Sequence, residues 1–114
     1  MPRNKLLVIN VAALGWNQAE RLSVSGLTFR PATPVFPAVT CVAQASIRTG
    51  ALPASHGLVG NGLWFPELKK VLFWEQSALL VEGPRIWDDF RARGKRVGML
   101  FWQQSLGESV DLVL

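Results

Sequence analysis

Cysteine, histidine and long apolar runs are scarce in this sequence, and each scarcity excludes a class of protein. The single cysteine, Cys41, rules out an internal disulfide framework and any zinc-finger spacing. The single histidine, His56, cannot by itself build a zinc site. No segment reaches the ~18 apolar residues that a membrane-spanning helix needs, so no membrane association is expected.

Charge is also sparse. Charged residues make up 18% of the chain, whereas 49% of its residues are hydrophobic and its mean hydropathy is +0.22. This composition predicts either a buried partner surface or an incomplete domain. The net charge is +4, and the basic residues cluster only at Arg91 to Arg96. A solvated helix end explains that cluster more simply than a nucleic-acid patch, because cations suit the negative end of the helix dipole. We therefore expect no nucleic-acid partner.

The N-terminal segment places basic residues before an apolar run, as a secretory signal would. The run is interrupted by Asn10, is rich in β-branched residues and is followed by no small-residue cleavage site. It is interpreted as a strand over Lys5 to Val11 that is buried on both faces. A cytoplasmic location is expected.

The rest of the pattern predicts an α/β protein. Helices are expected within 14–26, over 40–48 and through 85–93. A hairpin is expected over 63–77, with its turn at Pro66-Glu67, and further strands are expected at 96–102 and 109–114. Three prolines within 29–37 predict an extended connection.

The balance of elements predicts an incomplete sheet. Buried parallel strands need helices on both faces, and two good helices cannot cover three such strands. The expected fold is therefore α/β: part of a doubly wound, mostly parallel sheet with helices on both faces. Residues 1–114 are expected to form the N-terminal part of one larger domain; either its remainder is missing or another chain covers the exposed face of the sheet. The uncovered sheet would also favour a homo-oligomer of this fragment.

Thr40 stands where the proline-rich connection meets the helix expected over 40–48. The first amides of a helix are unpaired and its dipole favours negative charge, so a phosphoryl group would bind beside this hydroxyl. An ordinary threonine N-cap explains the same position, with Gly50 just past the helix end. As a nucleophile, the hydroxyl would need a metal or a base to activate it.

The segment FPAVTCVAQASIRTGALPASHGLVGN, residues 36–61, resembles the signature of the type I phosphodiesterase/nucleotide pyrophosphatase family of the alkaline phosphatase superfamily. The match is ungapped at Pro37, Thr40, Thr49, Gly50, Pro53, Ser55, His56, Gly57 and Asn61. The segments LLVINVAAL and RIWDDFRARGKRVGMLFW are similar to the family's first strand and to its Trp-bearing helix and following strand. Members are normally several hundred residues long, so the resemblance implies the N-terminal portion of an alkaline phosphatase-like catalytic domain.

The resemblance implies a metal-dependent hydrolase of phosphodiester or pyrophosphate bonds that acts through a phosphothreonine. Thr40 would be the nucleophile, held by one of two divalent ions, expected to be zinc, which the complete domain and not this chain alone would bind. Asn61 would donate its side-chain amide to a phosphoryl oxygen, and the backbone N–H of Cys41 would add a second donor. Most of the tryptophans are expected in the core, but the position of Trp64 just after Asn61 supports the hypothesis that it stacks on the nucleobase or apolar leaving group of a small-molecule phosphate ester. This chain alone is expected to be inactive.

Two departures from the family pattern keep an alternative open. Ala12-Ala13 stand where the family has the Asp-Gly pair whose aspartate ligates metal, which leaves Asn10 as a poorer metal ligand. Ala43-Gln44 replace the usual Asn-His, and Gln44 is expected on the exposed side of its helix. His56 is assigned to structure. The alternative is a non-catalytic relative, a binding or assembly module that has lost its metal site.

Overall fold

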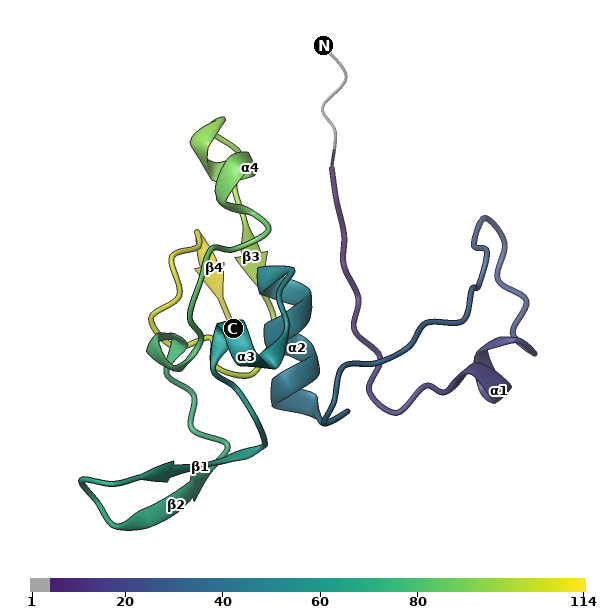
Figure 1. Cartoon of the computed structure of the whole chain (residues 1–114). Coiled ribbons are helices and arrows are strands. Elements are labelled where there is room, and N and C mark those ends of the chain that lie inside the picture. Colours follow the sequence, from purple (N-terminus) through teal and green to yellow (C-terminus); the bar gives the residue numbers. More distant parts are fainter. Residues whose placement is uncertain (1–4) are drawn as a thin grey trace. The chain divides into compact units, whose positions relative to one another are not determined.

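The computed structural model describes residues 5–114, which divide into two compact units (Figure 1). One unit ends at Thr33, and the second runs from Pro34 to Leu114. The regular structure described in the first unit is α1 (Trp16–Ala19), which begins after an extended Gly15. The helix expected within 14–26 is therefore confirmed over one turn.

The strand expected over Lys5 to Val11 is not formed. These residues have no regular structure, and the side chains of Leu7 and Ile9 are 80% and 72% exposed. A buried parallel strand needs hydrogen-bonded neighbours and apolar cover on both faces. The described part of the first unit contains no other strand that could supply them. The apolar run is therefore not sufficient to make a strand here.

The second unit is built around α2 (Thr40–Thr49), the longest helix that the structure describes. Its N-cap is Val39, whose backbone is extended, and the first bond of the helix runs from the N–H of Ala43 to the carbonyl of Val39. Gly50 ends the helix in the left-handed conformation at φ 67°, as expected. The expected N-cap role of Thr40 is wrong, because the helix starts one residue earlier and its hydroxyl caps nothing.

One face of α2 is buried, at a spacing of three and four residues. The buried side chains on this face are Cys41, Gln44, Ala45 and Arg48. The expectation that Gln44 is exposed is wrong: its side chain is 7% exposed, because its position in the helix places it on the same face as the other three. Cys41 and Ala45 form the apolar core together with Leu58 and Val81.

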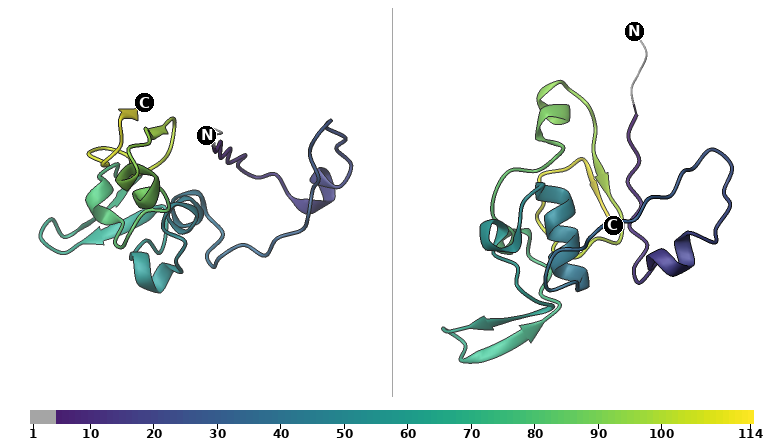
Figure 2. Two further views of the ribbon diagram at one scale, coloured as in Figure 1. Left: turned by 90° about the horizontal axis from the view of Figure 1, so that it is seen from above. Right: turned by 45° about the vertical axis from the view of Figure 1, so that its right-hand side comes forward.

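α3 (Pro53–His56) is a single turn that lies beside α2 (Figure 2). Proline fits its first position because an N–H there would have no helical partner. Gly57 ends the turn with φ 81°, a conformation that glycine adopts without a steric penalty. These two residues explain why the turn-rich segment after α2 forms a short, defined helix.

The expected hairpin is confirmed. β1 (Gly62–Phe65) pairs antiparallel with β2 (Lys70–Phe73), and Pro66 lies in the turn between them. Gly62 lies opposite Phe73, whose ring comes within 2.7 Å of the place that a Cβ on Gly62 would occupy. Only glycine therefore fits at this end of the hairpin without moving the ring.

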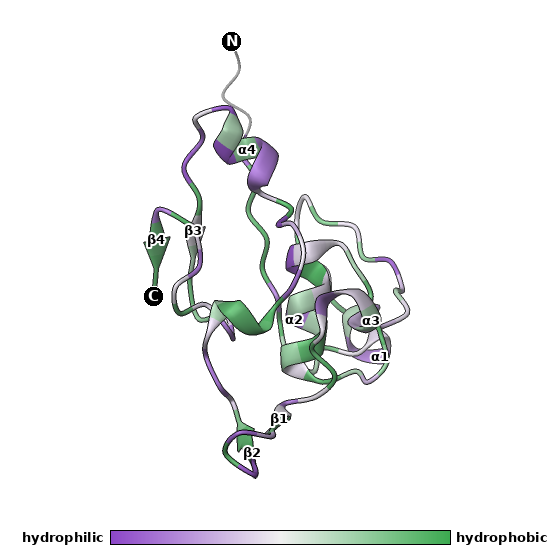
Figure 3. Cartoon of the chain, turned by 60° about the vertical axis from the view of Figure 1, so that its left-hand side comes forward, coloured by the Kyte–Doolittle hydropathy of each residue, from purple (hydrophilic) through white to green (hydrophobic). Residues whose placement is uncertain are grey.

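The C-terminal third contains short elements. The 3₁₀ turn η1 (Ala78–Leu80) precedes α4 (Asp88–Ala92), which mixes charged and apolar residues and contains no buried residue (Figure 3). β3 (Gly98–Met99) pairs with β4 (Leu112–Val113) in parallel, as a mostly parallel sheet predicts. Both strands and the helix are shorter than the sequence pattern predicts.

The observed architecture is a mixture of helices and strands with two small sheets, compatible with a fragment of an α/β fold. The larger doubly wound sheet remains a prediction. Within residues 5–114, none of the helices combines the length and the apolar character needed to cross a bilayer.

Candidate functional site

Thr40 opens α2 with a half-buried side chain. Within residues 5–114 its hydroxyl has no hydrogen-bond partner. The N–H groups of Thr40, Cys41 and Val42 all precede the first bond of the helix, which starts at Ala43. The hydroxyl therefore lies beside the end of the helix that carries unpaired donors and a partial positive charge.

Asn61 connects the hairpin to this end of α2. Its Oδ1 accepts a hydrogen bond from the backbone N–H of Cys41 at 3.0 Å, across 20 residues of sequence. Its backbone oxygen accepts the N–H of Trp74 at 2.9 Å. Asn61 thus provides the side-chain cap that Thr40 does not provide. Because Oδ1 is engaged, the amide is oriented, and its Nδ2 group makes no hydrogen bond to any residue that the structure describes.

The structure therefore brings three of the predicted site residues together: Thr40, Cys41 and Asn61. The Cys41 N–H already donates to Asn61, so its contribution to the site is to orient the Asn61 side chain. The Cys41 thiol is fully buried beneath the first turn and accepts a hydrogen bond from Gln104 Nε2 at 3.3 Å.

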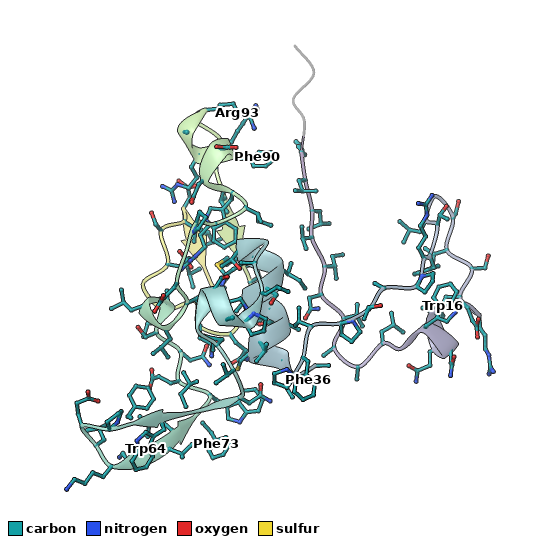
Figure 4. All side chains as sticks on the ribbon, in the orientation of Figure 1. Trp16, Phe36, Trp64, Phe73, Phe90 and Arg93 are labelled. Carbon is teal, nitrogen blue, oxygen red and sulfur yellow. The ribbon has the colours of Figure 1, made fainter. Side chains whose placement is uncertain are left out.

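Trp64, which is also a predicted site residue, lies in β1 on the projecting hairpin. Its side chain is 59% exposed and lies opposite Val71 in the ladder. Figure 4 shows its ring, together with that of Phe73, on this hairpin. An exposed indole offers a flat apolar surface on which another ring can stack.

The predicted metal ligand Asn10 belongs to the first unit, whereas Thr40 belongs to the second. No three histidine, cysteine, aspartate or glutamate side chains converge anywhere in residues 5–114. One amide oxygen and one hydroxyl lack the imidazole and carboxylate groups that zinc binds most strongly. The described residues therefore do not fit a zinc ion by themselves. Ala13 has φ 61°, a backbone conformation that glycine adopts more readily than alanine.

His56 joins α3 to α2. Its Nδ1 accepts the N–H of Leu58 at 3.2 Å, so Nε2 carries the proton and donates to Ser46 Oγ at 2.8 Å. A protonated Nε2 cannot act as a base toward Ser46, which excludes a serine–histidine nucleophile in this arrangement. Burial lowers the pKa of His56 below its usual value. The contacts support the structural role assigned to this histidine.

Sequence patterns did not reveal a buried ionic cluster at the other end of α2. Arg48 Nη1 donates to the backbone oxygen of Gln104 at 2.7 Å and lies 3.5 Å from Glu108 Oε2. The same carboxylate oxygen lies 2.9 Å from Arg85 Nε. Burial lowers the pKa of Arg48 to about 10, so the guanidinium stays charged at neutral pH. The burial of Arg48 could have been predicted from its spacing: it follows Cys41 by seven residues, which places both side chains on the same face of the helix.

Comparison with known proteins connects this site to a family. The family model described as "Type I phosphodiesterase / nucleotide pyrophosphatase" matches residues 16–111. The chain belongs to this family. An ectonucleotide pyrophosphatase/phosphodiesterase of Caenorhabditis elegans is 34% identical over an alignment of 73 residues, and the match covers 60% of this chain. The match covers 9% of that relative, so the chain spans a small part of the curated protein it matches. The resemblance drawn from the Thr40–Asn61 signature is thereby confirmed.

Proposed function

We propose that this chain carries the nucleophile and part of the phosphate-binding site of a hydrolase that cleaves phosphodiester or pyrophosphate bonds. Family membership supports the reaction class. One observation carries the assignment of residues: an unpartnered Thr40 hydroxyl lies at the start of α2, where Asn61 is fixed by its bond to Cys41. The remaining groups needed for turnover would come from the complete protein.

In this proposal the Thr40 oxygen attacks phosphorus and forms a new P–O bond. The bond to the leaving group breaks, and its electron pair departs on the leaving oxygen. Water then attacks the same phosphorus, releases the product and restores the threonine hydroxyl. Splitting the displacement into two steps is the usual advantage of a covalent intermediate.

Asn61 and the helix end would stabilise the negative charge that develops on the phosphoryl oxygens. The Asn61 Nδ2 group would donate to one of them while its Oδ1 stays bonded to Cys41. The dipole of α2 adds a fixed positive potential at the same place. A single oriented donor of this kind contributes about 10²–10³-fold to kcat.

Activation of Thr40 requires a group beyond these residues. A free hydroxyl is a weak nucleophile, and its proton needs an acceptor. Within residues 5–114 no titratable side chain is hydrogen-bonded to Thr40. Members of the family are typically metal-dependent, and the ligands of any such ions would come from parts of the protein outside this chain.

The substrate we propose is a small-molecule phosphate ester with an aromatic or nucleobase group. Trp64 supports this choice, because its exposed ring follows Asn61 by three residues on the same hairpin. Its position allows stacking on a flat leaving group or base.

The alternative is a non-catalytic relative that binds an anion at the same helix end. The sequence resemblance, which aligns Ala12 with the family's metal-binding aspartate, favours it. In that case the loss of the Thr40 hydroxyl would leave anion binding largely intact, because the dipole and the Asn61 amide would remain.

Hydrolysis of p-nitrophenyl thymidine phosphate by the complete protein, together with its metal content, tests the proposal. We expect bound divalent metal and turnover in the wild type, loss of turnover in Thr40→Ala, and wild-type turnover in Thr33→Ala, which removes an exposed hydroxyl. A protein with neither metal nor turnover would favour the binding relative, and equal turnover in Thr40→Ala would exclude Thr40 as the nucleophile.

A further inference from the structure

Gln104 contacts α2 at two levels. Its backbone oxygen accepts a hydrogen bond from Arg48 Nη1 at 2.7 Å, and its side-chain Nε2 donates to Cys41 Sγ at 3.3 Å. Arg48 and Cys41 are seven residues apart, which is ~10.5 Å along a helix axis. Between them, the N–H of Gln103 donates to Gln44 Oε1 at 2.8 Å. Three contacts along one face restrict both sliding and rotation of α2.

The same Gln104 amide also reaches the irregular segment that follows the hairpin. Its Nε2 donates to the backbone oxygen of Glu75 at 2.9 Å. The preceding residue, Trp74, donates its N–H to Asn61, and Asn61 accepts the N–H of Cys41. These bonds close a ring around the first turn of α2 that runs through Cys41, Asn61, the 74–75 segment and Gln104. Asn61 of the proposed function lies on this ring, and Thr40 directly precedes its member Cys41.

The backbone of Gln104 supports a constrained role. The residue is 2% exposed and has φ 49°, in the left-handed region that residues other than glycine rarely occupy. Such a conformation persists only where the surroundings hold it. Here they do so through Arg48, through the Glu75 carbonyl and through Gln76 Oε1, which accepts the N–H of Gln104 at 3.2 Å.

We propose that Gln104 is a positioning residue: it holds the first turn of α2, and with it Thr40, at a fixed place relative to Asn61. The inference rests on the proposed function, because it gives Gln104 a part in placing the nucleophile. Small displacements of reacting groups are costly in catalysis, so the contact would influence turnover without touching substrate.

Hydrogen exchange of the 114-residue chain tests the contact itself. Gln104→Met keeps the length of the side chain, removes the donor and also removes a buried Oε1 that has no partner in residues 5–114. We expect exchange of the Cys41 amide to accelerate at least tenfold, with less than a twofold change at Val81. Gln18→Met is the matched control, because it makes the same substitution at an exposed glutamine whose side chain bonds to Gly15 and leaves the bond to Cys41 in place. Gln104→Gly, which suits a positive φ, should reproduce the acceleration if Gln104→Met folds poorly.

An unchanged Cys41 amide, or equal acceleration at Cys41 and Val81, would overturn the positioning role. In the complete protein we further expect Gln104→Met to lower kcat at least tenfold with KM within twofold of wild type, whereas Gln18→Met leaves both near wild type. Normal wild-type turnover with unchanged kcat in Gln104→Met would overturn the positioning role alone. Absence of turnover in the wild type would overturn the proposed function, and with it the catalytic part of this inference.

Discussion

Asn61 allows the structural and the catalytic roles of one side chain to be separated. Its Oδ1 caps α2 through the Cys41 N–H at 3.0 Å, whereas its Nδ2 is the proposed phosphate donor. Asn61→Ala removes both functions. Asn61→Asp keeps the acceptor, places a negative charge at the helix N-terminus and removes only the donor. The two variants should therefore differ in stability but not in the direction of their effect on turnover.

The size of each effect follows from these contacts. Loss of a side-chain N-cap costs about 1 kcal/mol of unfolding free energy, so Asn61→Ala should be destabilised by that amount. A carboxylate at a helix N-terminus adds ~0.3–1 kcal/mol, so Asn61→Asp should be as stable as wild type or more stable. Turnover should fall about 10²–10³-fold in both variants, because each loses one oriented donor. Repulsion of an anionic phosphoryl group should lower turnover further in Asn61→Asp.

Urea unfolding of the 114-residue chain and turnover of the complete protein measure the two effects separately. The reasoning predicts that stability follows Asp ≥ Asn > Ala while turnover follows Asn ≫ Ala ≥ Asp. Wild-type turnover in Asn61→Asp would refute the donor role and leave Asn61 as a helix cap. Unchanged stability in Asn61→Ala would refute the capping role.

Three further variants test other parts of the structure. Glu108→Gln leaves the buried Arg48 without its carboxylate and should lower the unfolding free energy by about 3 kcal/mol. The control Glu67→Gln removes an exposed carboxylate and should change the unfolding free energy by less than ~0.5 kcal/mol. Equal effects of the two variants in urea titrations would contradict the claim that burial makes the Arg48–Glu108 pair important for stability. Burial lowers the pKa of His56, so on acidification the imidazole takes up a proton in the unfolded state before it does so in the folded state. The contribution of neutral His56 to the unfolding free energy should therefore be fully present above pH ~6.5 and be lost as the pH falls through the folded pKa. His56→Gln should reduce the change of unfolding free energy with pH between pH 7 and 5.5. If this pH dependence is the same in the variant, groups other than His56 cause it. Trp64→Ala should leave stability nearly unchanged and lower kcat/KM several-fold for nucleotide esters relative to esters without a ring; an unchanged ratio would remove the stacking role.

The elements that the sequence predicted well are those determined by local signals. α2 follows a proline-rich connection and ends at Gly50, whose left-handed conformation stops the helix. The hairpin depends on its turn at Pro66 and on the close packing of Gly62 against Phe73. These signals lie within a few residues of the structure they specify.

The failures concern features that depend on distant partners. The apolar run at 5–11 has the composition of a buried strand, but a strand also needs neighbours to pair with. Gln44 and Arg48 are polar, so hydropathy places them outside, yet the 103–108 segment supplies their buried partners from nearly 60 residues away. Their spacing relative to Cys41 indicated the shared face, but not the residues that cover it.

The candidate site shows the same division. The Thr40–Asn61 signature predicted which residues belong together, and the structure places Asn61 within hydrogen-bonding distance of the residue after Thr40. The bond from Asn61 to Cys41 and the contact from Gln104 had no local signal, because each joins segments 20 or more residues apart.

The most direct test of the central claim is to trap the covalent intermediate. The complete protein would be mixed with p-nitrophenyl thymidine phosphate and quenched in acid within the first turnovers, and its peptides would be mapped by mass spectrometry. The proposed mechanism predicts a thymidylyl group on Thr40 that forms together with the p-nitrophenolate burst, is removed later by water, and is absent from Thr40→Ala. Turnover with the adduct on another residue, or with no adduct while a burst is seen, would contradict it.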